Sequence, residues 1–372
     1  MNIVVAVDKF KGSLTSFDAC TQIKAAIKSI YPRQNVAIFP MADGGDGFVE
    51  VIKYYQRTQT IRVNTVDPLN RKIKGNYQWD ENKKTAYIEL AVASGLVLLK
   101  TQERNPCITS SYGTGILMNH AIKKGAKKIV LGLGGSATND GGLGIAAALG
   151  FTFFDKYQNE LAPVGASMIH VRHIKKPSTI PKIKIEIACD VINPLYGKNG
   201  AAFVYGPQKG ATPSQVIQLD KGLKALAKVI LKETGNDIST LQGLGAAGGV
   251  SAMLSAYFNA TMVKGIDLVI KNSDILKVLK KANLLITGEG KIDAQSTAGK
   301  VVGTLVNIAK TLKLPILLVA GTAEINLKSD LKNIPCITIK DKKTSTKRAM
   351  EQAAIILKAK VKAYFDKENQ VS

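Results

Sequence analysis

The sequence predicts an α/β fold with parallel sheet, arranged in two domains. Short apolar runs alternate with helical patterns along most of the 372 residues, beginning with IVVAV (3–7) and the helical spacing of 16–30. The chain is also too long for one ordinary hydrophobic core. Residues 60–99 differ, because they hold extended stretches joined by polar turns. That change indicates antiparallel or mixed sheet, and therefore a second domain.

The remaining elements follow in order. Each has the apolar or amphipathic pattern of a strand or a helix, bounded by polar or glycine-containing residues. Strands are expected at 35–39, 128–133, 185–189, 284–287 and 315–321, and helices at 48–55, 250–258 and 345–365.

Composition excludes several classes of protein. No stretch approaches the length of a membrane span, so no membrane partner is expected. The opening residues lack the pattern of a signal peptide and are expected to form a strand. The four cysteines are far apart and form no CxxC pair, which argues against disulfides and a zinc site. These features favour the cytoplasm.

The net charge of +23 raises the question of a nucleic-acid partner. However, 44 of the 51 basic residues are lysines, whereas base and phosphate recognition favours the planar fork of arginine. The lysines are spread along the chain, and aromatic residues are sparse. We therefore expect solvated helix faces and no nucleic acid, with a field that attracts small anions.

A cluster of polar residues follows each of five expected strands. In open α/β sheets, ligands bind beyond the carboxyl ends of the strands, so these clusters are expected along one edge of the structure. They lie at 8–13, 40–47, 132–142, 190 and 288–293.

The segment GLGGSATNDGG (132–142) has the strongest pattern among them. Glycines allow a close backbone approach to a ligand, and a following helix start would add N–H donors, so the loop is expected to hold phosphate or the substrate carboxylate. Asp140 in the same loop suits magnesium that accompanies phosphate. The predicted binding residues of this loop are Gly134, Gly135, Ser136, Thr138 and Asn139.

Further loops add candidate ligand contacts. Gly44 and Gly45 follow the second strand, and Lys209 in PQKGA is expected to hold an anion. GLGAAGG (243–249) contains GxGxxG without a preceding strand, so it is a weak dinucleotide motif, but Gly248 is a candidate for phosphate or substrate. AQSTAGKV (294–301) lacks the first glycine and the Ser/Thr of a Walker loop. We reject that interpretation and keep Lys300 as a phosphate contact.

The residue inventory fits a small-molecule kinase better than a hydrolase. There is no GxSxG motif, and the three histidines fit no metal or triad spacing. Phosphoryl transfer needs cations, a metal and one base. We expect Asp190 to be the base or the orienting carboxylate, although it could instead cap a turn, with Lys11 and Asp43 also catalytic. Nucleotide and metal roles are predicted for Gly288, Glu289, Gly290, Lys300 and Asp293.

Seven motifs together resemble the type I glycerate kinase family over nearly the whole chain. GGSATNDGG and NPLYGKNGAAFVYGPQKGAT are the most specific parts. The motifs are DKFKGSLTS (8–16), PMADGGDG (40–47), TSSYGTG (109–115), GLGGSATNDGGLGIAAALG (132–150), CDVINPLYGKNGAAFVYGPQKGAT (189–212), GLGAAGG (243–249) and GEGKIDAQSTAGK (288–300).

The resemblance implies transfer of the ATP γ-phosphoryl group to D-glycerate with a divalent metal, Mg²⁺, giving 2-phospho-D-glycerate. It also implies a Rossmann-like parallel sheet built from both chain ends (1–62 and 283–372), an inserted α/β domain with mixed sheet (63–282) and an active site in the cleft between them. Asp46 replaces the family's usual glutamate, and Lys9 its usual serine. A kinase of a related hydroxy acid, a basic nucleic-acid-binding protein and an inactive anion-binding module stay open as alternatives.

Overall fold

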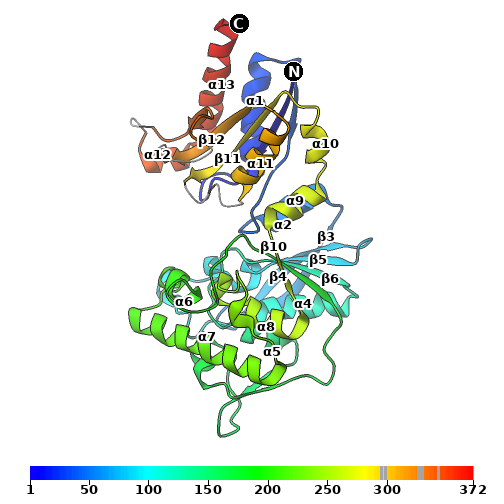
Figure 1. Ribbon diagram of the computed structural model, residues 1–372, viewed down its shortest axis with the longest axis vertical. Helices are drawn as coiled ribbons and strands as arrows, with labels where there is room; N and C mark the ends of the chain where they lie inside the picture. The colour runs from blue at the N-terminus through cyan, green and yellow to red at the C-terminus, as the bar shows by residue number, and fades with distance from the viewer. Residues whose placement is uncertain (294–295, 297–299, 325–330, 342–343, 372) are drawn as a thin grey trace. The chain divides into compact units, whose positions relative to one another are not determined.

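The computed structural model divides into two compact units. Unit 1 contains Met1–Asp43 and Gly265–Ser372, and unit 2 contains Gly44–Lys264. The structure describes residues 1–293, 296, 300–324, 331–341 and 344–371. Both chain ends belong to unit 1, and one continuous segment forms unit 2 (Figure 1). The sequence-based boundaries assign 44–62 and 265–282 to the other part, and they stay a prediction.

Unit 1 is built on an all-parallel sheet with the strand order β13-β12-β11-β1-β2. β1 is buried over five consecutive residues, as expected for a parallel strand covered on both faces. The strands are β1 (Asn2–Val7), β2 (Asn35–Ile38), β11 (Leu284–Ile292), β12 (Ile316–Ala323) and β13 (Cys336–Thr338).

Helices cover both faces of this sheet. One core joins alternate residues of β1 and β12 to α1 and α13, and a second core joins the other residues of β12 to α11. Thr15 caps α1, because its hydroxyl accepts a hydrogen bond from the Asp18 N–H. The helices are α1 (Ser16–Ile30), α9 (Gly265–Asn272), α10 (Ile275–Leu279), α11 (Val301–Thr311), α12 (Thr346–Glu351) and α13 (Ala353–Val371).

Unit 2 contains a mixed sheet with the order β10-β9-β6-β5-β4-β3. β3, β4 and β5 pair antiparallel, whereas β5, β6, β9 and β10 run parallel. A separate antiparallel pair joins β7 to β8. The strands are β3 (Gln59–Val66), β4 (Lys72–Asp80), β5 (Thr85–Glu89), β6 (Lys128–Gly132), β7 (Thr152–Phe154), β8 (His173–Lys175), β9 (Lys184–Ala188) and β10 (Thr261–Val263).

One large apolar core holds unit 2 together, with residues from the mixed sheet and from α4, α5, α7 and α8. α7 begins with a capping box between Thr212 and Gln215 and ends at a left-handed Gly235. The α-helices are α2 (Phe48–Tyr55), α3 (Ala91–Ser94), α4 (Tyr112–Lys123), α5 (Leu143–Ala148), α6 (Ala201–Tyr205), α7 (Pro213–Thr234) and α8 (Ser251–Phe258). The 3-10 helices are η1 (Leu96–Leu98), η2 (Thr101–Glu103), η3 (Gly165–His170), η4 (Pro207–Lys209), η5 (Ile238–Thr240) and η6 (Ala246–Gly248).

These sheets confirm the predicted fold class, including the change to mixed sheet near residue 60. Two details were wrong. The strand expected at 284–287 continues to Ile292, because it pairs with β12 as far as Ala323 and Ile292 is buried against α11. The single helix expected at 345–365 is two helices, because the chain leaves the helical conformation at Gln352.

Within the described residues, we find no helix with the length and hydropathy that crossing a bilayer requires.

Candidate active site

The parallel strands of the mixed sheet bring several predicted loops to one edge of unit 2. Glu89, Gly132 and Ala188 are partners in register at the carboxyl ends of β5, β6 and β9. The Gly47 N–H donates a hydrogen bond of 2.5 Å to Glu89 Oε1. Asp190 is half-buried two residues beyond β9. The edge therefore gathers three of the segments that the sequence singled out.

Tight backbone approaches join these segments. A Cβ placed on Gly134 would lie 2.2 Å from the Asp46 nitrogen, and one on Gly44 would lie 2.9 Å from the Ala188 oxygen. Gly135 is exposed and has a φ of +65°. Gly45 is half-exposed, and its carbonyl accepts the Phe48 N–H at the start of α2. Gly44, Gly45, Gly134 and Gly135 thus lie where the strands β6 and β9 end.

Asp140, the predicted metal ligand of this loop, is engaged by hydrogen bonds within the protein. Its buried carboxylate accepts hydrogen bonds from Ser111 N and Ser111 Oγ (2.7 Å each), from Gly142 N (3.0 Å) and from Gly144 N (3.2 Å). Burial raises the pKa of Asp140, and these hydrogen bonds oppose the rise. Because Ser111 precedes α4 and Gly142 precedes α5, Asp140 ties two helix starts together. This geometry favours a structural role over the predicted metal role.

The same contacts correct the expected source of anion binding. The N–H groups at the start of α5 donate to Asp140 Oδ1 and Oδ2 and, from Ile145, to Ser111 Oγ at 3.1 Å. α5 also has only six residues. The start of α5 therefore does not offer these three backbone donors to a ligand.

Three residues supply unpartnered polar atoms at this loop. Thr138 Oγ1, both amide atoms of Asn139 and Ser251 Oγ are buried and have no hydrogen bond within the described part of the chain. The exposed fraction of all three residues is 0%. Buried polar groups normally have partners, because leaving them unpaired is costly. These atoms are therefore the best candidates for contacts with a bound polar ligand.

Lys209 lies beside these polar atoms. Among the described residues it is the only buried lysine, with an exposed fraction of 2%. Its Nζ donates hydrogen bonds of 2.7 Å to Ser136 Oγ and 2.7 Å to the Thr138 carbonyl oxygen. Burial lowers the pKa of Lys209 to about 7, although the Asp140 charge opposes this. A cation whose hydrogen-bond partners are neutral is suited to an anionic ligand.

The second glycine loop packs directly on this set. The Gly141 N–H donates to the Gly248 carbonyl oxygen at 3.1 Å. Gly248 has a φ of +73°, and a Cβ there would lie 2.1 Å from the Thr138 oxygen. η6 thus places Gly248 against Thr138 and Asn139. These three candidate residues belong to two separate sequence motifs.

Unit 1 has its own group of carboxylates at the carboxyl end of its sheet. Burial raises the pKa of Asp8 well above its usual range, and Asp43 and Glu289 add to the rise. Burial also raises the pKa of Glu289, where Lys300 opposes and Asp43 reinforces the shift. Glu289 Oε1 is buried and has no hydrogen-bond partner among the described residues. Such mutual repulsion would be relieved by a bound cation.

Other predicted residues of unit 1 lie close to these carboxylates, since the charges of Lys300 and Asp293 act on Glu289. Lys11 is exposed in the turn after β1, and Asp293 pairs with Lys291 at 3.2 Å. Gly288 pairs with Val7 and Val319 inside the sheet, and Gly290 also belongs to β11, so neither lies in a loop. Lys300 precedes α11. Most of the Walker-like stretch 294–301 lies outside the described residues.

The five predicted clusters therefore belong to the edges of two sheets, where the sequence suggested one. Asp8 and Ser251 received no role from sequence reasoning. The available signals were the position of Asp8 directly after the first strand and that of Ser251 directly after GLGAAGG. Only the fold shows that Asp8 is buried near other carboxylates and that Ser251 is buried without a partner.

The sequence profile of the glycerate kinase family matches residues 3–366. The chain belongs to this family. It is 39% identical to a glycerate kinase of Halalkalibacterium halodurans, over 86% of this chain and 85% of the relative. It is 38% identical to the glycerate 2-kinase of Escherichia coli, over 87% and 85% of the two chains.

A solved structure agrees with this membership. It was determined for a protein assigned as glycerate kinase 2 from Salmonella typhimurium LT2, and it is 36% identical with a TM-score of 0.81. The match covers 100% of this chain and 99% of that chain. Together with the family match, these relatives show that this glycerate kinase family member is an enzyme, a transferase of the kinase class.

Proposed function

We propose that the protein transfers the γ-phosphoryl group of ATP to the 2-hydroxyl group of D-glycerate, giving 2-phospho-D-glycerate and ADP. The observation that carries the proposal is the buried set of Thr138, Asn139 and Ser251 beside Lys209, which is polar, lacks internal partners and suits a small hydroxylated anion. The similarity to the glycerate 2-kinase of Escherichia coli supports the 2-position.

In this proposal the two units have different tasks. The unpartnered side chains of unit 2 bind glycerate, with Gly44, Gly45, Gly134, Gly135 and Gly248 shaping the loops around it. Glu289, Lys300 and the β11 glycines of unit 1 serve the nucleotide. Phosphoryl transfer requires both sets to meet around the substrates, in a cleft between the predicted domains.

Mg²⁺ fits the carboxylates of unit 1. Burial and neighbouring carboxylates raise the pKa values of Asp8 and Glu289 more than Lys9 and Lys300 lower them, and a bound cation would favour the ionised forms. The described residues contain no ready-made group of three metal ligands. That is compatible with Mg²⁺, which keeps several waters and binds through one or two carboxylates plus phosphates. Asp8, Asp43 and Glu289 are the candidates for the one or two carboxylates that would hold the ion, and bound Mg²⁺ would offset charge on the phosphates.

The proposed chemistry needs one proton acceptor. The 2-hydroxyl oxygen of glycerate forms a bond to the γ-phosphorus, while the bond from that phosphorus to the β,γ-bridging oxygen breaks and ADP leaves. The hydroxyl proton passes to the Asp190 carboxylate. Lys209 holds the substrate in place, and Lys11 is a candidate cation for the phosphates.

An enolase-coupled assay tests the product directly. Enolase converts 2-phosphoglycerate, but not 3-phosphoglycerate, into phosphoenolpyruvate, whose ultraviolet absorbance reports the 2-position. We expect ADP release and phosphoenolpyruvate at equal rates from D-glycerate with ATP and Mg²⁺. Glycolate, lactate and tartronate serve as comparison acceptors. Equal rates on all four would favour the related-hydroxy-acid kinase, and ADP release without phosphoenolpyruvate would indicate the 3-position.

We also propose a reducing compartment, the cytoplasm. None of the four cysteines forms a disulfide, and burial raises the pKa of Cys20 to about 12, so this thiol is unreactive.

A further inference from the structure

Arg104 is a second cation of unit 2 without an acidic partner. Its Nε is buried and makes no hydrogen bond with any described residue. No carboxylate of the described chain lies within ion-pair distance of its guanidinium. Buried or half-buried arginines are usually paired, because an unpaired guanidinium donor loses its hydration without compensation.

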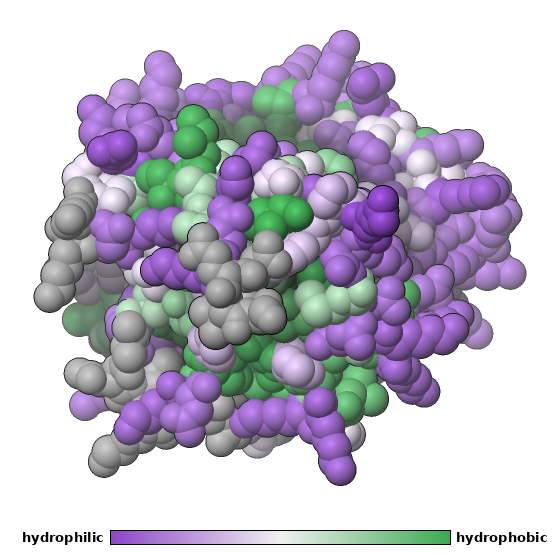
Figure 2. Space-filling model, turned by 90° about the horizontal axis from the view of Figure 1, so that it is seen from above, coloured by the Kyte–Doolittle hydropathy of each residue, from purple (hydrophilic) through white to green (hydrophobic). Residues whose placement is uncertain are grey.

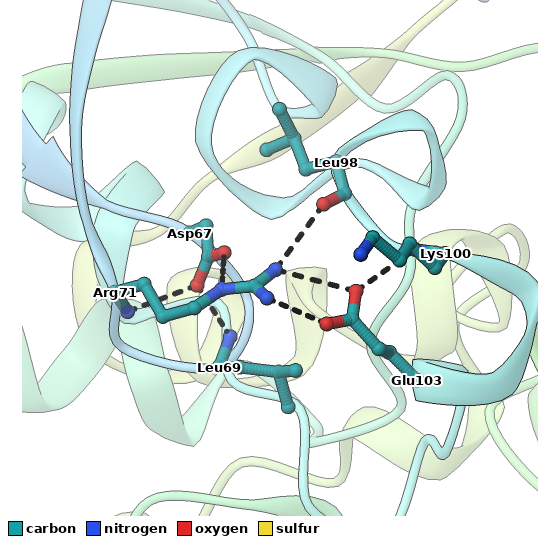
Figure 3. Close-up of polar contacts among 6 residues, drawn as sticks. All are labelled: Asp67, Leu69, Arg71, Leu98, Lys100 and Glu103. Atoms are coloured by element: carbon teal, nitrogen blue, oxygen red, sulfur yellow. Dashed lines mark hydrogen bonds and ion pairs between the residues drawn. The ribbon is translucent and has the colours of Figure 1, made fainter.

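Arg71 shows what a satisfied arginine of the same unit looks like (Figure 3). Its Nε donates to Asp67 Oδ2 at 2.5 Å, and its NH1 donates to Glu103 Oε1 at 2.7 Å. Glu103 Oε2 also accepts the Lys100 N–H at 2.9 Å. These contacts hold η2, the helical turn that ends directly before Arg104. The backbone that presents Arg104 is therefore fixed by charged contacts, although Arg104 itself takes no part in them.

Arg104 also lies next to the lysine that borders the candidate site. A Cβ on Gly210 would lie 2.2 Å from the Arg104 carbonyl oxygen and 2.9 Å from its Cβ. Gly210 follows Lys209, whose Nζ reaches Ser136 and the Thr138 carbonyl. Asp140 is the acid whose charge acts on Lys209, and its oxygens are already committed to four hydrogen bonds. Arg104 and Lys209 thus lie on adjoining backbone segments, and neither forms an ion pair with a carboxylate of the described residues.

We propose that Arg104 binds the carboxylate group of the hydroxy-acid acceptor, together with Lys209 and the side-chain amide of Asn139. This inference rests on the proposed function, because it assigns the anionic end of that acceptor. The planar guanidinium donates two parallel hydrogen bonds to a carboxylate, which a lysine cannot do. A nucleotide phosphate has the same attraction to a cation, but the proposed nucleotide residues belong to unit 1. We therefore assign the carboxylate.

The test compares Arg104→Gln with Arg62→Gln, an exposed arginine of β3 in the same unit. Loss of a charge-assisted pair should raise the KM for D-glycerate by about 10- to 100-fold. The KM for ATP should stay within about twofold, and Arg62→Gln should change neither constant. Thermal unfolding without ligand should be unchanged in Arg104→Gln, whereas the stabilisation by D-glycerate alone should disappear.

A neutral acceptor distinguishes a substrate-binding role of Arg104 from a structural role. Wild-type protein should prefer D-glycerate strongly over D-glyceramide, whose carboxamide replaces the carboxylate, and Arg104→Gln should lose most of that preference. Arg104→Lys keeps the charge without the fork, so we expect an intermediate KM. If Arg104→Gln does not fold, Arg104→Lys carries the comparison.

Three results would contradict the proposals, each in a different way. An unchanged KM for D-glycerate in either Arg104 variant, with active wild-type protein, would contradict the role of Arg104 alone. A raised KM for ATP with an unchanged KM for D-glycerate would assign a nucleotide phosphate to this place. Wild-type protein that turns over ATP with another acceptor, but not with D-glycerate, would contradict the proposed function itself.

Discussion

Lys209 differs from most lysines of the chain because its side chain is buried. It is one of 44 lysines, yet its ammonium group is buried between Ser136 and the Thr138 carbonyl. Burial opposes the charged form, so the pKa of Lys209 falls to about 7. The charge that would hold an anion is therefore present at slightly acidic pH and is lost as the pH rises through that value.

This pKa predicts a pH-dependent KM. Above pH 7, the wild-type KM for D-glycerate should rise about tenfold per pH unit, because only the protonated lysine attracts the carboxylate. Lys209→Met should show a high KM at every pH, whereas the exposed Lys280→Met should match wild type. Steady-state kinetics between pH 6 and pH 9 measure this.

The stability of the protein provides a readout without substrate. Between pH 7 and about pH 10 the unfolded chain keeps the Lys209 proton that the native state has lost, so this residue makes the free energy of unfolding rise with pH. Lys209→Met should remove that part of the rise. A pH-independent KM in wild-type protein would show that Lys209 does not contact the substrate.

The proposed role of Asp190 can be tested directly. Asp190→Asn keeps the size of the side chain but cannot accept a proton, so kcat should fall about 10²- to 10⁴-fold while both KM values stay within a few-fold. Asp274→Asn, at an exposed position of unit 1, should leave kcat unchanged. A nearly normal kcat in Asp190→Asn would show that Asp190 only caps a turn.

At the scale of elements, the loop after β6 and the turn η6 act as one unit. The Gly141 N–H bonds to the Gly248 carbonyl, and Gly248 leaves no space for a side chain beside Thr138. Asp140 fixes the other end of the loop by joining the starts of α4 and α5. The unpartnered side chains of Thr138 and Asn139 are thus placed by contacts on both sides.

A pair of glycine substitutions tests this placement. Gly248→Ala and Gly235→Ala both put alanine in a left-handed conformation, which costs about 1–2 kcal/mol. Gly235 has no atom within 4 Å of an added Cβ, whereas Gly248 has the Thr138 oxygen at 2.1 Å. We expect a larger loss of melting temperature and a strong loss of activity in Gly248→Ala alone. Equal effects in both variants would show that the Gly248 contact is unimportant.

At the scale of the whole molecule, the cores of the two units are built from separate stretches of sequence. The unit 2 core draws its buried residues from 63–258, whereas the cores of unit 1 draw theirs from 3–36 and 286–365. Most lysines lie outside these cores, and the face in Figure 2 is largely hydrophilic. This supports the expectation that the +23 charge reflects a solvated surface, which stays a prediction with respect to nucleic acid.

Because the two units have separate cores, we predict that unit 2 folds alone. A fragment of residues 44–264 should show cooperative thermal unfolding by circular dichroism, because its core needs no residue from either chain end. A fragment of residues 265–372 should remain unfolded, because β1 is absent and β11 then lacks its partner on one side. Non-cooperative melting of 44–264 would show that the chain ends complete its core.

The sequence by itself determined the fold class and predicted the loops that form the candidate site. Alternating apolar runs and helical patterns identified the parallel sheet, and glycine-rich loops identified Ser136, Thr138, Asn139 and Gly248, because these signals are local. Tertiary structure decided how the polar groups are used. Asp140, a predicted metal ligand, links two helix starts, and Arg104 became a candidate because its Nε has no hydrogen-bond partner among the described residues. Hydrogen-bond satisfaction depends on residues far apart in the chain, such as Asp140 with Ser111 or Lys209 with Ser136, and no local pattern records it.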